Sequence, residues 1–353
     1  MEYDAARINR FDLTRYPDYR GDAPPDVYQL HRFGHLDEYE AEWGRRWGAN
    51  GIGRLRDVAL SRPTGYEVLD LWLKHPRFFL LRYSSRIDLD ALVRNHEDYE
   101  RLLRSLGIDV HWIEYDHPMG AYGPMRKLFM CAEVKVVAGG AIISRWGQAS
   151  FKRGLARPFT RFLVGMDCPI LHTVHGRAVC ELGPMGLPIA EDAWITGTSN
   201  CATPEGWAQV RPTLEEAGIK HFVPMPLQII RDDFDNGGEF HTDMVIAAVN
   251  ERTVLIYPAF TPWETYRWLR DHQFTIIEVP REEHHRFTPE NLLIVEPGKV
   301  IVNAGARETI RRLQAHKVEV IPFDCHGIMQ GGVNGMRCIT LEMRRDEGPS
   351  LDH

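Results

Sequence analysis

The sequence predicts an α/β protein in which five repeats form a pseudo-symmetric propeller about an axis. Two observations support this prediction. One pattern of apolar runs, turns and helical segments recurs along the chain, and the last repeat is divided between the two chain ends. Alternating strands and helices are typical of α/β units, and a recurring period is typical of repeat folds. A doubly wound α/β sheet remains an alternative, although no glycine-rich nucleotide-binding motif follows any expected strand.

Each repeat is expected to contain a strand, a turn, a second strand, a helix and a third strand. The clearest repeat begins at Phe240 and ends near residue 280. The first strands are expected at 131–137, 178–184, 241–249, 291–296 and 337–343. The helices are expected at 151–163, 203–218, 263–272, 307–316 and 89–107. The run at 337–343 is expected to pair with the run at 54–62, because joining the two chain ends closes a ring of repeats.

Composition narrows the class of protein. The chain has 353 residues, of which 44% are hydrophobic, and a formal net charge of -7. An acidic chain lacks the basic footprint of a nucleic-acid-binding protein. The charged N-terminal segment has no signal-peptide core, no apolar stretch is long enough to span a membrane, and the six cysteines form no CxxC pair. We therefore expect a cytoplasmic protein with reduced thiols, no nucleic-acid partner and no membrane contact.

The candidate functional residues lie at the start of the first strand of four repeats. They are Glu133, Glu181, His241 with Asp243, and Cys338. In a ring of repeats, equivalent strand ends converge on the axis, so a thiol, an imidazole and carboxylates would meet at one point. His241 and Asp243 are two residues apart in an expected strand, which would place both side chains on one face.

Each candidate also has a purely structural interpretation. The triplet His241–Asp243 could be a solvated turn before a strand that begins at Met244. Cys338, which follows the glycine-rich GGVNGMR, could be a buried structural thiol. Glu133 and Glu181 could face solvent from their strands. Their common position in the repeat favours the functional interpretation.

Six segments in the same order resemble the superfamily of arginine deiminases, dimethylarginine dimethylaminohydrolases and amidinotransferases, the penteins. The segments are GIGRLRDVALSRP, RNHEDYERLLRSLGIDVHWIE, AGGAIISR, ITGTSNCATPEG, GGEFHTDMVI and GGVNGMRCIT. The resemblance extends from about Gly51 to Met343. It implies a five-bladed pseudo-symmetric α/β propeller, with a single catalytic domain at residues 51–353 and an N-terminal extension at residues 1–50 that packs on it.

The resemblance also implies a role for each candidate. Cys338 matches the nucleophile, His241 the general acid and base, and Glu181 the acidic partner of the histidine. Asp243 and Glu133 match the two carboxylates that hold a guanidinium. The family's Arg-Asp pair is replaced by Ala132-Glu133, and its second acidic motif ends in Pro184 instead of aspartate. Both departures argue against a standard arginine deiminase.

These roles imply a cofactor-free enzyme that acts on a small guanidino or amidino molecule through a covalent S-amidino intermediate. We expect a hydrolase; an amidinotransferase and a catalytically silent binding protein are alternatives, and a homo-oligomer is possible. A metalloenzyme is the remaining class, with ligands from 232–235 (DDFD) or 282–287 (EEHHRF). Neither segment has a standard zinc spacing, so both are expected to be solvated loops and no metal is expected.

Overall fold

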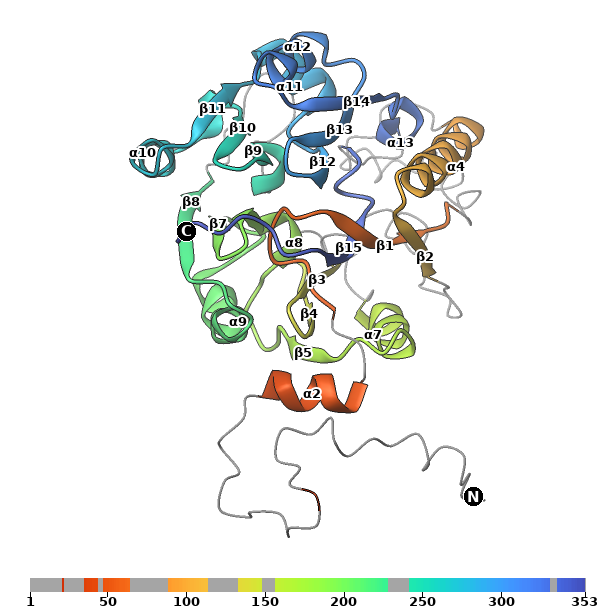
Figure 1. Cartoon of the computed structure of the whole chain (residues 1–353), viewed down its shortest axis with the longest axis vertical. Helices are drawn as coiled ribbons and strands as arrows, with labels where there is room; N and C mark the ends of the chain where they lie inside the picture. Colours follow the sequence, from red (N-terminus) through yellow and green to blue (C-terminus); the bar gives the residue numbers. More distant parts are fainter. Residues whose placement is uncertain are drawn as a thin grey trace, which may run out of the picture.

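The chain, seen here in a computed structural model, is a ring of five three-stranded sheets with helices around its outer side (Figure 1). The structure describes residues 21, 35–43, 47–63, 88–113, 133–147, 156–227, 241–330 and 335–352. Within these ranges, every helix is too short or too polar to cross a membrane. The cytoplasmic location stays a prediction.

In four of the sheets the three strands follow one another along the chain. They are β3 (Val134–Val137), β4 (Gly140–Ile143) and β5 (Ile170–Thr173); β6 (Gly186–Ala190), β7 (Ala193–Thr198) and β8 (His221–Pro226); β9 (Ile246–Asn250), β10 (Thr253–Ile256) and β11 (Thr275–Glu278); and β12 (Leu293–Glu296), β13 (Lys299–Asn303) and β14 (Glu319–Phe323). In each sheet the central strand pairs antiparallel with the first and parallel with the third. This repetition confirms the predicted propeller, and the doubly wound alternative is wrong.

The fifth sheet joins the two ends of the described chain, as the sequence predicted. Strand β15 (Leu341–Arg345) pairs antiparallel with β1 (Leu55–Ser61), and β1 pairs parallel with β2 (Asp109–Ile113). Asp57 of β1 is buried and accepts hydrogen bonds from Arg344 Nε at 2.7 Å and His111 Nε2 at 2.9 Å. One carboxylate thus links all three strands at the point where the ring closes.

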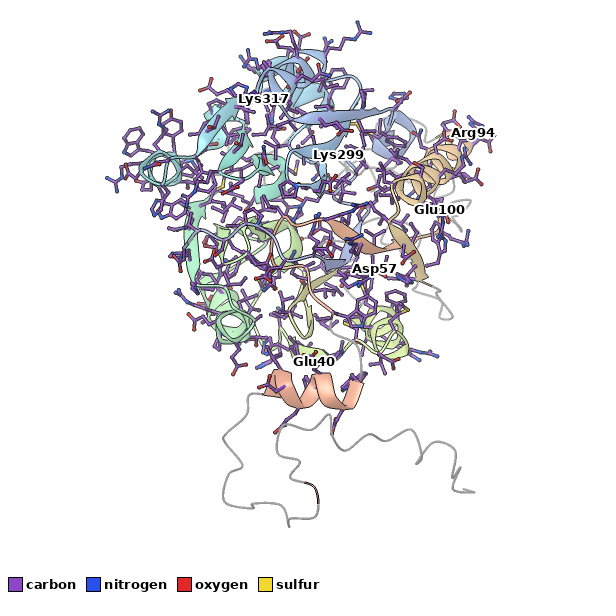
Figure 2. All side chains as sticks on the ribbon, in the orientation of Figure 1. Glu40, Asp57, Arg94, Glu100, Lys299 and Lys317 are labelled. Atoms are coloured by element: carbon purple, nitrogen blue, oxygen red, sulfur yellow. The ribbon has the colours of Figure 1, made fainter. Side chains whose placement is uncertain are left out.

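The five helices that the periodicity predicted lie on the outside of the ring (Figure 1). They are α4 (Leu89–Ser105), α7 (Ala156–Gly165), α9 (Pro204–Glu216), α10 (Trp263–Asp271) and α12 (Arg307–Ala315). The structure adds α2 (His35–Trp43), α8 (Leu182–Met185), α11 (Arg281–Phe287) and α13 (His326–Gln330), with 3-10 turns η4 (Thr242–Met244) and η5 (Pro258–Phe260). Helix α4 buries Leu92, Tyr99 and Leu103 and exposes charged residues such as Arg94 on its outer face (Figure 2). This amphipathic pattern explains why helix positions could be predicted from spacing alone.

All five predicted first strands begin later than expected, and in two of them a short helix or 3-10 turn takes the place of the expected strand start. Residues 178–184 were predicted as a strand, but they lead into the short helix α8, and the strand is β6. Pro184 has no N–H for a sheet and fits the first turn of a helix. Residues 241–249 begin with the 3-10 turn η4, which the Val245 N–H closes onto the Thr242 carbonyl at 2.9 Å. His241 and Asp243 therefore do not share a strand face, and the triplet is not a solvated turn either, because both residues are buried.

The segment EEHHRF forms helix α11, so the expectation of a solvated loop is wrong. His284 is 2% exposed and its Nδ1 lies 2.9 Å from Glu290 Oε1. Its ring stacks on Tyr257 with 3.7 Å between ring centroids. A buried imidazole needs such a partner, so we interpret this pair as part of the packing between α11 and the strand that follows it. The other acidic segment, 232–235, lies outside the described residues.

Residues before 51 contact the body of the propeller. Leu36 of α2 lies against Gly139 in the turn between β3 and β4, and the Gly139 N–H donates to the Trp47 carbonyl at 2.8 Å. Trp47 is 1% exposed and donates through Nε1 to the Asp167 carbonyl at 3.1 Å. These contacts hold Leu36 and Trp47 against the propeller, and the division into an N-terminal extension and a catalytic domain at residue 51 stays a prediction.

Candidate active site

All five predicted site residues lie in the turns that immediately precede first strands. Glu133 precedes β3, Glu181 is the N-cap of α8 before β6, His241 is the N-cap of η4 before β9, and Cys338 lies in the turn before β15. Asp243 lies within η4. First strands of neighbouring sheets contact one another, β3 with β15, β6 with β9 and β9 with β12. The turns before them consequently gather at one end of the ring, and all five side chains are buried.

His241 and Glu181 form a direct pair. Nε2 of His241 lies 2.8 Å from Oε2 of Glu181, and Oε1 of Glu181 accepts the Gly147 N–H at 2.9 Å. Glu181 is fully buried and His241 is 8% exposed. The two residues come from neighbouring repeats, so the pair crosses the boundary between two sheets.

The surroundings of His241 favour its protonated form. Burial lowers the pKa of the imidazole, but the nearby Cys201 sulfur and the Glu181 carboxylate raise it, and the net pKa is well above its ordinary value. A histidine with a raised pKa contributes stability that is complete below the pKa of the unfolded chain, about 6.5, and is lost as pH rises through the folded-state pKa. Around neutral pH, His241 thus carries a proton that it can donate.

Cys201 belongs to this cluster, and it was not among the residues predicted from the sequence. It lies in the turn that follows β7, and its backbone carbonyl accepts the Glu181 N–H at 2.8 Å. Its sulfur, a ring nitrogen of His241 and a carboxylate oxygen of Glu181 all lie within 4.8 Å of one another. The segment ITGTSNCATPEG contained this thiol, but it is not at the start of a first strand, so the repeat pattern could not reveal it.

Asn291 connects Cys338 with Asp243. Its Oδ1 accepts the Cys338 backbone N–H at 3.2 Å, and its Nδ2 donates to the Asp243 carbonyl at 3.5 Å. Asn291 is 1% exposed and directly precedes the β12 repeat, which had supplied no candidate residue. Each of the five repeats therefore contributes a polar residue from the turn before its first strand. The same position in the repeat of β12 would have identified Asn291 from the sequence.

Arg337, the residue before Cys338, is the second neighbour that the sequence pattern did not reveal. Its Nε lies 3.7 Å from Asp243 Oδ2, and its Nη2 donates to the Gly183 carbonyl at 3.3 Å. Its Nη1 lies 3.8 Å from Glu342 Oε1. A guanidinium of the chain itself thus contacts the carboxylate that was expected to hold a substrate guanidinium.

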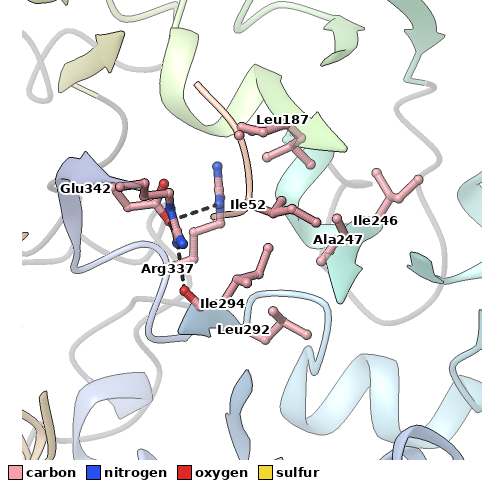
Figure 3. Close-up of a pocket in the computed structure, with 12 residues that line it drawn as sticks. Ile52, Leu187, Ile246, Ala247, Leu292, Ile294, Arg337 and Glu342 are labelled. Atoms are coloured by element: carbon pink, nitrogen blue, oxygen red, sulfur yellow. Dashed lines mark hydrogen bonds and ion pairs between the residues drawn. The ribbon is translucent and has the colours of Figure 1, made fainter. Parts of the chain in front are cut away.

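A small cavity adjoins Arg337 and is lined by the first strands β6, β9, β12 and β15 (Figure 3). Leu187, Ile246 and Leu292 form its apolar side, and Arg337 and Glu342 form its charged side (Figure 3). The charges are balanced by close partners. Burial alone would raise the pKa of the Glu342 carboxyl. The positive charges of Arg345 at 2.8 Å, Lys135 at 3.7 Å and Arg337 together lower it by more, so the net pKa lies far below its ordinary value.

Glu133 is 1% exposed. Its backbone carbonyl accepts the Ser144 N–H at 2.9 Å, and the Ser144 hydroxyl accepts the Leu182 N–H at 3.0 Å. This chain of hydrogen bonds connects the turn of Glu133 to the helix that follows Glu181. Glu133 is therefore linked through Ser144 to the residue that follows Glu181, and its role toward a substrate stays a prediction.

Comparison with known proteins agrees with this architecture. The chain is 29% identical over 358 residues to a 2-nitroimidazole nitrohydrolase of Mycobacterium sp. (strain JS330), covering 96% of this chain and 93% of that protein. No family model matches the chain.

Two solved structures are similar across most of the chain. A dimethylarginine dimethylaminohydrolase from Pseudomonas aeruginosa in complex with citrulline matches with a TM-score of 0.63 at 19% identity, covering 82% of this chain and 99% of that one. The substrate-bound N-terminal domain of a cyanobacterial arginine dihydrolase matches with a TM-score of 0.67 at 13% identity, covering 82% and 98%. The chain is thus a five-bladed α/β propeller. Its fold is that of the pentein superfamily, which the sequence resemblance implied.

The pair with Glu181 sets the charge state of His241, which leads to a prediction about pH. Glu181→Gln removes the negative charge that raises the pKa of His241, so the imidazole should lose its proton at lower pH than in the wild type. The ring carbon shift of His241, followed by NMR across the pH range, measures this directly.

Glu290→Gln is the matched control, because it removes the equally buried carboxylate that pairs with His284. It should leave the titration of His241 unchanged. A titration of His241 that is identical in the wild type and in Glu181→Gln would contradict the assigned cause of the shift.

Proposed function

We propose that this chain is a hydrolase that acts on the carbon of a guanidino or amidino group in a small molecule, with Cys338 as the nucleophile. The observation that carries the proposal is the cluster at one end of the propeller axis. There, a buried thiol, an imidazole–carboxylate pair and a further carboxylate precede the first strands of three different repeats. These are the groups that covalent catalysis at an amidine carbon requires, a nucleophile, a proton donor and anionic ligands.

The reaction begins with binding and attack. A planar guanidinium donates paired hydrogen bonds that match carboxylates, and Asp243 and Glu133 are the carboxylates proposed to accept them. The Cys338 thiolate forms a bond to the guanidino carbon and gives a tetrahedral intermediate. A positive charge on His241 and on the bound substrate stabilises the thiolate form of the nucleophile.

Proton transfer by His241 completes both halves of the reaction. Protonated His241 donates its proton to the departing amine, the carbon–nitrogen bond breaks, and an S-amidino adduct remains on Cys338. His241, now neutral, accepts a proton from water as the water oxygen bonds to the same carbon. The carbon–sulfur bond then breaks, which releases a ureido product and regenerates the thiolate. The raised pKa of His241 suits the first proton donation, and Glu181 holds the ring in place for both steps.

The two alternatives differ from this reaction in the steps after substrate binding. In an amidinotransferase, an acceptor amine takes the place of water in the second half, and the same residues serve both reactions. In a silent binding protein, no adduct forms. The simultaneous presence of Cys338, His241, Glu181 and Asp243 in buried, bonded positions favours an enzyme over a binding protein.

A second candidate substrate class is a neutral molecule with an amidine-type carbon. The contact between Arg337 and Asp243 favours it, because a positive charge already lies beside the carboxylate that a cationic substrate would need. The similarity to a 2-nitroimidazole nitrohydrolase points the same way, since C2 of that ring lies between two nitrogens, as a guanidino carbon does. With such a substrate, Cys338 would displace nitrite from the carbon, and water would then release a cyclic urea.

The proposal predicts turnover that depends on Cys338. The wild-type chain should hydrolyse at least one compound in a panel of cationic guanidines, neutral amidines and 2-nitroimidazole, as measured by ureido product, released amine or nitrite. Cys338→Ser should lower kcat by roughly 10⁴-fold or more, because the catalytic residues act together and loss of the nucleophile removes most of their combined effect on the rate.

Cys325→Ser is the matched control, because it changes a buried thiol that belongs to the packed core. It should retain the rate. Turnover that survives in Cys338→Ser would overturn the assignment of the nucleophile, and a complete lack of turnover across the panel would favour the silent binding protein.

The contact of Arg337 with Asp243 predicts a change in specificity. Arg337→Gln removes a competing positive charge, so the ratio of kcat/KM for cationic over neutral substrates should rise by about tenfold, the value of one charge-assisted contact of about 1.4 kcal/mol. Lys135→Gln is the control, because the ion pair of Lys135 goes to Glu342. A ratio that is the same in all three proteins would show that Arg337 does not influence substrate charge.

A further inference from the structure

Three potential metal ligands of different chemistry meet around His241. They are the Cys201 sulfur, a ring nitrogen of His241 and a carboxylate oxygen of Glu181, all within 4.8 Å of one another. Each comes from a different turn, and each residue is buried. We propose that this cluster is a binding site for a single Zn²⁺ ion.

The ligand set suits zinc by chemistry and by number. Zn²⁺ is bound by thiolate, imidazole and carboxylate groups, and sites with three protein ligands keep a fourth position for water. Tetrahedral coordination needs ligand atoms roughly 3.3–3.8 Å apart, given metal–ligand distances of about 2.0–2.3 Å. The three atoms lie within 4.8 Å of one another, so small side-chain shifts would reach this spacing, and the His241–Glu181 contact at 2.8 Å would open to admit the ion.

The backbone around the ligands is held in place before any ion binds. The turn that carries Cys201 is closed by two hydrogen bonds between Ser199 and Ala202, at 3.1 and 3.3 Å, and the Cys201 N–H donates to the Ser199 hydroxyl at 3.0 Å. The Glu181 N–H donates to the Cys201 carbonyl, and the Gly147 N–H holds Oε1 of Glu181. Outer contacts of this kind orient metal ligands and strengthen binding.

A second cluster of metal-binding side chains offers a weaker site. Asp192, His221 and Asp352 also lie within 4.8 Å of one another, but Lys220 Nζ lies 3.0 Å from Asp352 and 3.8 Å from Asp192. An ammonium group already neutralises those carboxylates. In addition, the Asp352 side chain is 43% exposed. The charge and the burial of the Cys201 cluster are thus better matched to a divalent ion.

Zinc binding would have a chemical consequence for the candidate active site. The ion would take the lone pair of His241 and a carboxylate oxygen of Glu181, so His241 could no longer transfer protons. Reversible inhibition by zinc follows, and this consequence rests on the proposed function, whereas binding of the ion does not. Binding should tighten as pH rises, because the thiol and the imidazolium must lose their protons to coordinate a metal.

The test uses the reduced, chelator-treated full-length chain and Co²⁺ as a spectroscopic substitute for Zn²⁺. One equivalent of Co²⁺ should give a thiolate-to-cobalt absorption band that Zn²⁺ displaces. The band should persist in Cys338→Ser and disappear in Cys201→Ser. Zn²⁺ affinity in Cys201→Ser should fall by more than the roughly 10–100-fold that loss of an outer contact costs.

X-ray absorption of the zinc-loaded wild type keeps the test decisive if Cys201→Ser does not fold. It should show one sulfur at about 2.3 Å and the remaining ligands nitrogen or oxygen. Absence of stoichiometric binding, two sulfur ligands, or a cobalt band that depends on Cys338 instead of Cys201 would each overturn the proposal. These binding measurements need no substrate, so they decide the metal site even if the chain proves to have no guanidine hydrolase activity.

Discussion

The pairing of β1 with β15 is the constraint on which the rest of the molecule depends. It joins strands from opposite ends of the chain in one sheet, and the buried carboxylate of Asp57 links that sheet through Arg344 and His111. Once the ring is closed, the first strands of the repeats lie side by side, and the turns before them are brought to one end. Cys338, nearly three hundred residues from the start of β1 in sequence, reaches the site only because β15 is held in this sheet.

The second feature of the structure is that titratable side chains buried in the ring are bonded in pairs. His241 with Glu181, His284 with Glu290, and Glu342 with Arg345 are each bonded at 2.8–2.9 Å inside the ring. A buried charge without such a partner would cost several kcal/mol, so these pairs keep the polar interior of the propeller compatible with folding. Arg337 is the buried partner of Asp243. Its guanidinium would therefore compete with a substrate guanidinium for the same carboxylate.

The sequence predicted the fold well because its signals are local. Apolar runs and amphipathic helices repeat in order, so the number of repeats and the split last sheet could be derived from them. Strand starts were harder, because polar residues such as Glu181 and His241 precede the apolar run and form short turns instead of strand. Side-chain contacts between different repeats do not produce a local sequence pattern from which they could be predicted. Cys201 and Arg337 therefore emerged only from the structure, although Asn291 occupies a position that the repeat pattern could have identified.

Two buried thiols now lie among the candidate site residues, and the central claim is that only Cys338 forms a bond to the substrate. The most direct measurement is peptide mapping by mass spectrometry after the wild-type chain is mixed with a compound that it turns over and is quenched with acid. The account predicts an adduct on the peptide that contains Cys338 and none on the peptide that contains Cys201. An adduct on Cys201, or rapid turnover with no adduct on Cys338 at any time point, would contradict it.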